Sequence, residues 1–158
     1  MVRTDGYEYK LHANAEARKR SAISLVKLLL QKNVDILPEH REECLNIALW
    51  KITEAESAHK HRTRFCSEAA LTATREDLRH DHVFQRAVMV KELISCHPDQ
   101  VDEILAKAVA CTITKQEHII LNKHKRFDGW DRYKNANIRV IDTKTNDYTI
   151  PGEAIPLG

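Results

Sequence analysis

The sequence predicts an α+β protein that is mostly α-helical, with a helical domain, a small strand–helix element and a C-terminal β-hairpin. Three observations carry this expectation. Apolar residues recur at steps of three and four over long stretches of the chain. Short runs rich in β-branched residues follow in its second half. Hydrophobic residues make up 42% and charged residues 30% of the chain, which is typical of a globular protein.

Two helices are expected in the first part of the chain. Residues 14–33 favour a helix, since Asn14 can cap it and Leu25, Leu28 and Leu29 recur at helical spacing. A second helix should begin at Pro38, which suits a first helical position, and run to about residue 57. Its apolar stripe comprises Leu45, Ala48, Leu49, Ile52 and Ala55.

The middle of the chain predicts shorter elements. Residues 58–77 show no clear pattern beyond a short helix after Ser67, and residues 78–83 are typical of a short strand. Two further helices are expected over 84–95 and 98–109, the second with Val101, Ile104, Leu105 and Ala108 facing inward.

A strand over 110–113 and a helix that starts at Thr114 should follow. Thr114 and Glu117 form a capping box, in which each side chain satisfies an exposed amide of the other residue. This box places His118 in the first turn of the helix.

The C-terminal part predicts a turn at Asp128–Gly129, a helical pair of Trp130 and Tyr133, and a hairpin. The hairpin would join residues 138–141 to 148–150. We expect one domain over residues 1–158, with 1–12 and 151–158 as loose termini.

Composition narrows the classes of protein. No apolar segment of about 20 residues is present, so no membrane partner is expected and a cytoplasmic location is predicted. The four cysteines form no Cys-x-x-Cys pair and are interpreted as reduced thiols. The oligomeric state is open, with a homodimer as one option.

The net charge of +2 hides three basic segments, at residues 18–20, 59–64 and 123–126. Such segments can bind phosphate, so nucleic acid is the expected partner, with DNA and RNA not distinguished. Each segment alone is also typical of a solvated helix face.

The most suggestive residues for chemistry are His80, Asp81 and His82. In an extended segment alternate side chains point the same way, so His80 and His82 should share one face while Asp81 points to the other. A carboxylate and an imidazole side by side can supply a metal ligand and a base that deprotonates water.

In its residues 78–86 and 111–122, the chain resembles the HNH, or ββα-metal, nuclease family. The first stretch, Leu78-Arg79-His80-Asp81-His82-Val83-Phe84-Gln85-Arg86, resembles the family's strand that ends in an Asp-His or His-His pair. The second, Cys111-Thr112-Ile113-Thr114-Lys115-Gln116-Glu117-His118-Ile119-Ile120-Leu121-Asn122, resembles its strand and the helix that carries a later His.

The resemblance implies a ββα-like element with a metal-dependent endonuclease site. Asp81 and His118 would bind a divalent cation (Mg²⁺, Mn²⁺, Ni²⁺ or Zn²⁺), His82 would be the general base, and Arg86 would steady the phosphate. The family's second-strand Asn has no counterpart, because residues 83–117 contain no Asn. Histidines at the surface and a plain helix cap are the alternative reading of these residues.

A second group of possible site residues lies upstream. Acids, imidazoles and guanidinium groups occur here within a short stretch and could transfer protons at a phosphate without a metal. The group comprises Glu54, Glu56, His59, His61 and Arg64, with His80 as a further candidate. It is also typical of a charged helix end, where cations near the C-terminus are favoured by the helix dipole.

Three functions therefore stay open. The first is a small metal-dependent endonuclease that uses Asp81, His118 and His82. The second is a metal-independent ribonuclease that uses Glu56, His61 and Arg64. The third is a non-enzymatic module that binds nucleic acid or a protein, such as an inhibitor or adaptor.

Overall fold

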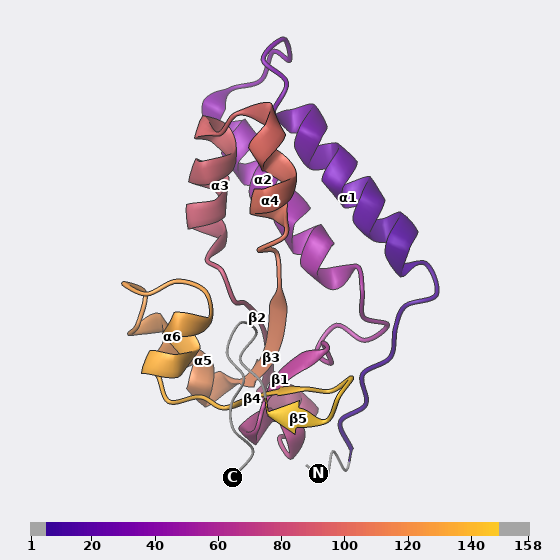
Figure 1. Ribbon diagram of the computed structural model, residues 1–158, viewed down its shortest axis with the longest axis vertical. Coiled ribbons are helices and arrows are strands. Elements are labelled where there is room, and N and C mark those ends of the chain that lie inside the picture. Colours follow the sequence, from indigo (N-terminus) through magenta and orange to yellow (C-terminus); the bar gives the residue numbers. More distant parts are fainter. Residues whose placement is uncertain (1–5, 149–158) are drawn as a thin grey trace.

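The computed structural model describes residues 6–148 and confirms the α+β class, with helices as the larger part (Figure 1). A group of helices lies at one end of the molecule and a five-stranded sheet at the other. The last two helices lie beside the sheet. Within the described residues no helix is long and apolar enough to span a bilayer.

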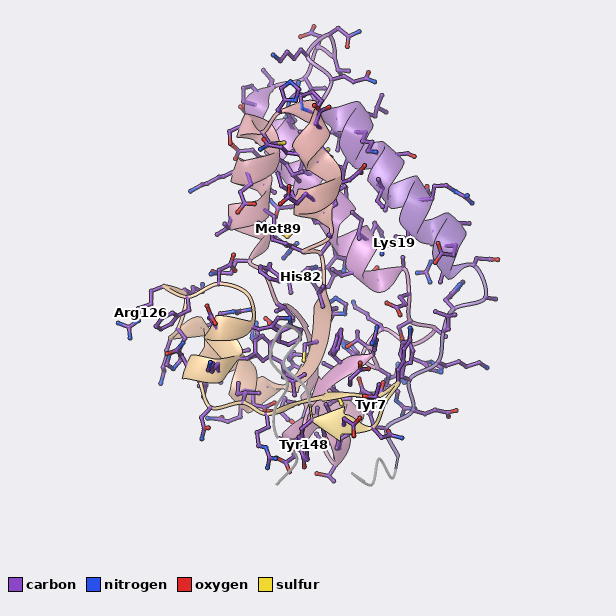
Figure 2. All side chains as sticks on the ribbon, viewed as in Figure 1. Tyr7, Lys19, His82, Met89, Arg126 and Tyr148 are labelled. Atoms are coloured by element: carbon purple, nitrogen blue, oxygen red, sulfur yellow. The ribbon has the colours of Figure 1, made fainter. Side chains whose placement is uncertain are left out.

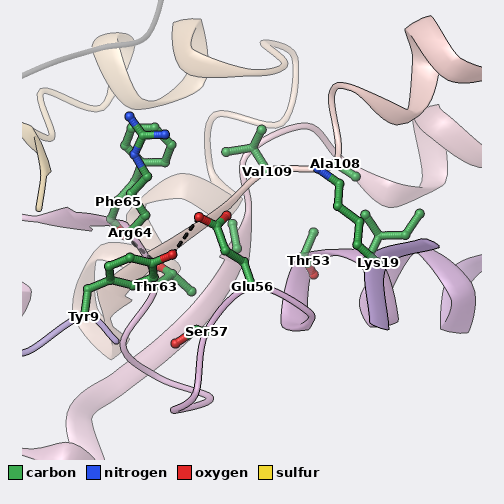
Figure 3. Close-up of a pocket in the computed structure, with 12 residues that line it drawn as sticks. Tyr9, Lys19, Thr53, Glu56, Ser57, Thr63, Arg64, Phe65, Ala108 and Val109 are labelled. Atoms are coloured by element: carbon green, nitrogen blue, oxygen red, sulfur yellow. Dashed lines mark hydrogen bonds between the residues drawn. The ribbon is translucent and has the colours of Figure 1, made fainter. Parts of the chain in front are cut away.

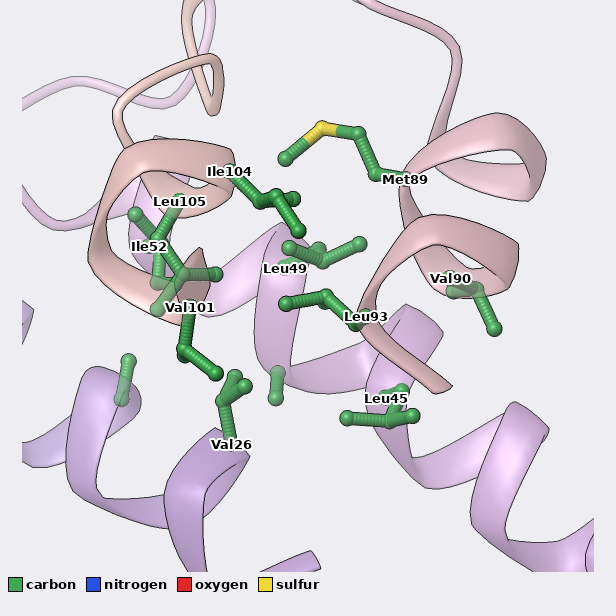
Figure 4. Close-up of a cluster of buried hydrophobic side chains, with 12 residues drawn as sticks. Val26, Leu45, Leu49, Ile52, Met89, Val90, Leu93, Val101, Ile104 and Leu105 are labelled. Atoms are coloured by element: carbon green, nitrogen blue, oxygen red, sulfur yellow. The ribbon is translucent and has the colours of Figure 1, made fainter. Parts of the chain in front are cut away.

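Four helices form the first group. They are α1 (Ala15–Leu29), α2 (Pro38–Glu54), α3 (Arg86–Ser95) and α4 (Val101–Leu105), the last preceded by the 3₁₀ turn η3 (Pro98–Gln100). Figure 4 shows their buried side chains meeting in one cluster. The cluster comprises Ala22, Val26, Leu45, Ala48, Leu49, Ile52, Met89, Val90, Leu93, Val101, Ile104 and Leu105.

The buried face of α1 differs from the predicted leucine spacing. Its buried residues are Ala15, Ala22 and Val26, whereas Leu25 and Leu28 are exposed. Small side chains on this face allow α1 to lie close to α2, with which it makes many contacts. The predicted helix over 98–109 also ends early, at Leu105, because the chain turns into a strand.

The sheet has the order β2-β3-β1-β4-β5. β1 is parallel to β3, and the other neighbours are antiparallel. The strands are β1 (Phe65–Ser67), β2 (Leu78–His82), β3 (Ala110–Thr114), β4 (Val140–Asp142) and β5 (Asp147–Tyr148). β1 lies at the centre, although the sequence predicted no strand there, and β2 lies at one edge.

Short turns join β1 to β2, and two helices cover one face of the sheet. The turns are η1 (Ala69–Leu71) and η2 (Arg75–Asp77). The helices are α5 (Lys115–Asn122), which starts at the predicted capping box, and α6 (Trp130–Asn135). They cover a second buried cluster, comprising Val83, Cys111, Ile113, Leu121, Tyr133, Ile138 and Val140.

The N-terminal segment covers part of the other face and is not loose from Tyr7 onward. Tyr7 is buried, and its hydroxyl donates to the carbonyl of Thr63 at 2.9 Å. Leu11 forms a β-bridge with Ser57. The expected loose terminus is therefore wrong for residues 7–12, because a buried tyrosine and backbone bonds fix them. Residues 1–5 and 151–158 lie outside the described residues.

The predicted C-terminal hairpin is confirmed as β4 and β5, joined by a turn in which Asn146 has φ of 59°. Asn tolerates this left-handed conformation better than most residues. Thr149 and Ile150, which were expected to continue the second strand, lie outside the described residues.

Candidate functional site

β2 places the two predicted histidines together. His80 and His82 point toward the end of α2, and both approach the hydroxyl of Thr53, while Asp81 points to the opposite face. The predicted alternation along the strand is confirmed. Figure 2 shows His82 where the helical group meets the sheet.

The hydroxyl of Thr53 joins the two imidazoles. Its Oγ1 lies 2.8 Å from Nε2 of His82 and 3.1 Å from Nε2 of His80. Nδ1 of His80 lies 3.3 Å from the carbonyl oxygen of Lys60, which can only accept a hydrogen bond. Nδ1 of a neutral His80 therefore carries the proton, and its Nε2 is an acceptor.

One arrangement of protons makes both contacts of Thr53 with the histidines hydrogen bonds. Thr53 has one hydroxyl proton, which it can donate to His80 or, at 3.0 Å, to the carbonyl of Trp50. When it donates to His80, the contact with His82 is a hydrogen bond only if Nε2 of His82 donates to Thr53. Nδ1 of His82 then has a lone pair, and it makes no hydrogen bond with any residue in 6–148.

Burial keeps both imidazoles neutral. It lowers the pKa of His80 to about 4, with the backbone carbonyl of Lys60 partly opposing the shift. Burial also lowers the pKa of His82 to about 2, aided by the neighbouring His80, Arg86 and Arg132. Both histidines are therefore uncharged near neutral pH.

Trp50 and Arg86 lie over the histidine pair. The ring centroid of Trp50 lies 4.8 Å from that of His80 and 4.5 Å from that of His82. The guanidinium carbon of Arg86 lies 4.9 Å from the Trp50 ring centroid, within cation–π distance. Arg86 begins α3 and is half-buried, and this burial lowers its pKa. Arg86 thus brings a positive charge to the Trp50 ring that lies over the histidine pair.

On the opposite face of β2, Asp81 is held by two residues of α6. Its Oδ2 accepts a hydrogen bond from Arg132 at 2.7 Å and another from the hydroxyl of Tyr133. Burial raises the pKa of Asp81, against the opposing effects of Arg132, Tyr133 and His118. Arg132 also donates to the carbonyl of His82 at 2.7 Å and so anchors the end of the strand.

The surroundings of Asp81 and His118, the two predicted metal ligands, limit their ability to bind the same ion. Asp81 already faces a guanidinium, whose positive charge opposes a cation beside it. His118 is half-buried on α5, near enough for its charge to affect Asp81. Among residues 6–148 no three His, Cys, Asp or Glu side chains are grouped so as to hold a metal ion. Metal binding by Asp81 and His118 stays a prediction.

The second predicted group is divided by the fold. Glu56 and Arg64 line one pocket of about 60 Å³, together with Tyr9 and Thr53 (Figure 3). His61 does not line this pocket, and its Nδ1 is buried without a hydrogen-bond partner among the described residues.

The remaining members of this group lie outside the pocket. Glu54 forms an ion pair of 3.6 Å with Lys51, and His59 is exposed. Thr53 nevertheless connects the two predicted groups, since it lines the pocket and bonds to both buried histidines.

One basic segment reaches the histidine pair, and another lies beside the start of α3. The first reaches it through Lys60, whose carbonyl contacts His80 and whose ammonium lies 5.9 Å from the Trp50 ring centroid. The second, residues 123–126, belongs to a loop held by Gln85. The side-chain amide of Gln85 donates to the carbonyl of Lys125 at 3.0 Å. Because Gln85 precedes Arg86, this basic loop lies beside the start of α3.

Sequence reasoning missed Thr53, Arg132 and Tyr133 as parts of the site. Thr53 follows the apolar stripe of α2 and carries no motif, while Arg132 is 51 positions from Asp81. No local spacing signals such a pairing.

Compared with known proteins, the chain matches no family model, no curated protein and no solved structure.

Proposed function

We propose that the protein is an endonuclease that hydrolyses phosphodiester bonds of nucleic acid, with His82 as the general base. One observation carries this proposal: Nε2 of the buried, neutral His82 lies 2.8 Å from the Thr53 hydroxyl, and a hydrogen bond donated by this nitrogen leaves a lone pair on Nδ1. A lone pair held in a fixed orientation is what a general base requires.

The low pKa of His82 concerns the protein without substrate. A base works best when its pKa is near the operating pH. A phosphate bound beside Arg86 adds negative charge, which favours the protonated imidazole and raises the pKa of His82. Substrate binding would thus strengthen the base at the moment it is needed.

Positive charge around His82 supports nucleic acid as the partner. Arg86 and Lys60 lie against Trp50, which covers the histidine pair, and Gln85 holds the loop at residues 123–126 beside the start of α3. Basic groups in such an arrangement follow a phosphate backbone. Arg86, stacked on Trp50, would hold the phosphate that is attacked.

The experiment compares the cleavage of plasmid DNA and RNA by the native chain and by His82→Gln. Each substrate is tested with Mg²⁺, Mn²⁺, Ni²⁺, Zn²⁺ and a chelator, so that the predicted metal role of Asp81 and His118 is tested as well. We expect cleavage by the native chain and a loss of at least about 100-fold in His82→Gln, the scale typical of a general base. His40→Gln, at an exposed position of α2, is the control and should cleave as the native chain does.

Two results would contradict this proposal. Equal cleavage by His82→Gln would remove His82 as the base. Salt-sensitive binding without turnover in any condition would favour the non-enzymatic module.

A metal-independent ribonuclease is the second candidate, because Glu56 and Arg64 line the same pocket. Cleavage of RNA that survives the chelator and is lost in Glu56→Gln, but not in His82→Gln, would favour this candidate.

A further inference from the structure

Three cationic side chains interact with His61 near the start of β2. Lys60 precedes His61 in the segment between α2 and β1, Arg75 begins the turn η2, and Arg79 is the second residue of β2. The carbonyl oxygen of Lys60 lies 3.3 Å from Nδ1 of His80, which places residues 60 and 61 against β2. We call Lys60, Arg75 and Arg79 the basic cluster.

Arg79 is held in a fixed orientation and keeps its charge. Its Nη1 donates to the carbonyl oxygens of Glu76 and Leu78, both at 2.8 Å. Carbonyl groups carry no net charge, so they orient the guanidinium without neutralising it. Arg79 makes no other side-chain hydrogen bond and no ion pair within residues 6–148. Its Nε and Nη2 donors are therefore left for an anion.

No acid neutralises the basic cluster within the described part of the chain, where its three cations form no ion pair. Of the two acids in η2, Asp77 accepts from the hydroxyl of Thr74 at 3.0 Å, and Glu76 forms no ion pair with a described residue. The pKa of His61 reflects the excess of positive charge. Burial lowers this pKa first, and the charges of all three cations lower it further.

We propose that the basic cluster binds a phosphodiester group of the nucleic acid, away from the phosphate that is attacked. A guanidinium can donate to two oxygens of one phosphate, and the other two cations add charge. An anion between unpaired cations also relieves their mutual repulsion. Arg79 precedes His82 by three positions in an extended strand, which corresponds to roughly 10 Å. A phosphate at the cluster is therefore not the one beside His82.

This inference rests on the proposed function and names a second contact with the same substrate. Lys60 connects the two places, because its ammonium lies 5.9 Å from the centroid of the Trp50 ring, which in turn lies over His82. A nucleic-acid strand that follows β2 can thus place one phosphate beside Arg86 and another at the basic cluster. A mononucleotide has only one phosphate linkage to offer and cannot occupy both.

The experiment measures the binding of labelled single-stranded and duplex DNA by fluorescence anisotropy at increasing chloride concentration, with a chelator present. The slope of log affinity against log salt depends on the number of phosphates that the protein neutralises. In the double variant Arg75→Gln/Arg79→Gln we expect this slope to fall by about 0.7 for a single strand or about 0.9 for a duplex. Arg20→Gln, at an exposed position of α1, is the matched control and should keep the native slope.

Two single variants separate charge from folding. Arg79→Lys loses the fork that the two carbonyl groups orient but keeps the charge, so the slope should stay near that of the native chain. Arg75→Gln changes an exposed side chain that makes no hydrogen bond within residues 6–148. This variant should bind DNA more weakly at low salt while its unfolding free energy stays unchanged.

His61 locates the bound phosphate. A phosphate at the basic cluster opposes the three charges that lower the pKa of His61, so this pKa should rise when DNA binds. NMR spectra of the histidine rings, recorded against pH with and without DNA, measure the change. His40, exposed on α2, is the internal control and should titrate equally in both.

An unchanged salt slope in the double variant, or an unchanged pKa of His61 in the complex, would overturn this proposal. Inorganic phosphate that displaces DNA from the native chain better than chloride at equal ionic strength, but not from the double variant, would show a site for free phosphate and would also overturn it. A reduced slope without cleavage of any nucleic acid would support the cluster and remove the hydrolysis. Cleavage with an unchanged slope would support the hydrolysis and remove the cluster.

Discussion

Oγ1 of Thr53 lies 2.8 Å from Nε2 of His82, the nitrogen that carries the proton in the proposed role of His82. This contact joins the end of α2 to the edge strand of the sheet. Replacing the hydroxyl by a methyl group in Thr53→Val keeps the shape and removes the acceptor. The buried N–H of His82 is then unsatisfied, so we expect a loss of about 1–3 kcal/mol in unfolding free energy. Denaturant titration measures it.

The same variant should lose cleavage activity, because Nδ1 of His82 is no longer held as the unprotonated nitrogen. Thr72→Val, at an exposed position whose side chain makes no hydrogen bond with another residue in 6–148, is the control and should stay within about 0.5 kcal/mol of the native chain. Equal stability of the two variants would show that the Thr53 hydroxyl does not stabilise the folded state.

Stability should fall as the solution becomes more acidic. The folded chain holds His80 and His82 neutral, with pKa values of about 4 and about 2, whereas an unfolded histidine titrates near 6.5. Below that pH the two histidines bind protons in the unfolded state but stay unprotonated in the folded state. Each histidine then lowers the unfolding free energy by up to about 1.4 kcal/mol per pH unit, until its folded pKa is reached.

His80→Gln tests this pH dependence. Gln can replace both hydrogen bonds of His80 but does not titrate. Denaturant titrations between pH 6 and pH 4.5 should give a shallower fall in unfolding free energy for this variant than for the native chain. Parallel curves for the two proteins would contradict the burial of a neutral imidazole at this position.

The ion pair between Arg132 and Asp81 should be costly to break. Both side chains are buried, and Arg132→Met leaves the Asp81 carboxylate without its cation. We expect Arg132→Met to lower the unfolding free energy by about 3–5 kcal/mol. Adding Asp81→Asn to this variant should make the loss smaller. Lys27→Met removes an exposed pair with Asp102 and should cost no more than about 1 kcal/mol. Similar losses for Arg132→Met and Lys27→Met would argue against the burial of the first pair.

Gly129 should not tolerate a side chain. Its φ of 64° and ψ of −149° belong to a region that is essentially limited to glycine. A Cβ atom there would lie 2.5 Å from Cε1 of Phe84. We expect Gly129→Ala to lose about 1–3 kcal/mol in thermal or denaturant unfolding. Gly6 also has a φ that is strained for Ala, but a Cβ atom there would meet no neighbour. If Gly6→Ala lost as much stability as Gly129→Ala, the role of the Phe84 contact would be contradicted.

Local sequence signals predicted several elements well. The capping box of Thr114 and Glu117 forms as expected, with the Glu117 amide donating to Thr114 Oγ1 at 3.1 Å and the Thr114 amide donating to Glu117 at 2.9 Å. The alternation of His80, Asp81 and His82 is also confirmed. Both features depend on residues within a few positions of one another, where backbone geometry alone decides the outcome.

Features that depend on distant residues could not be predicted in this way. β1 is only three residues long, and it is a strand because β3 and β4 pair with it from 45 or more positions away. The same holds for the partners of Asp81, since α6 reaches it only through the tertiary fold. The basic segments gave no indication that Lys60 would reach the histidine pair.

The proposed role of His82 requires a neutral ring with an unprotonated Nδ1 at neutral pH. Nitrogen-15 NMR of the histidine side chains measures both properties directly, with His82→Gln assigning the signals. We expect the His82 signals of a neutral ring with the proton on Nε2, unchanged from pH 7 to pH 5, because burial lowers its pKa to about 2. A proton on Nδ1, or a ring that becomes charged in this range, would contradict the account.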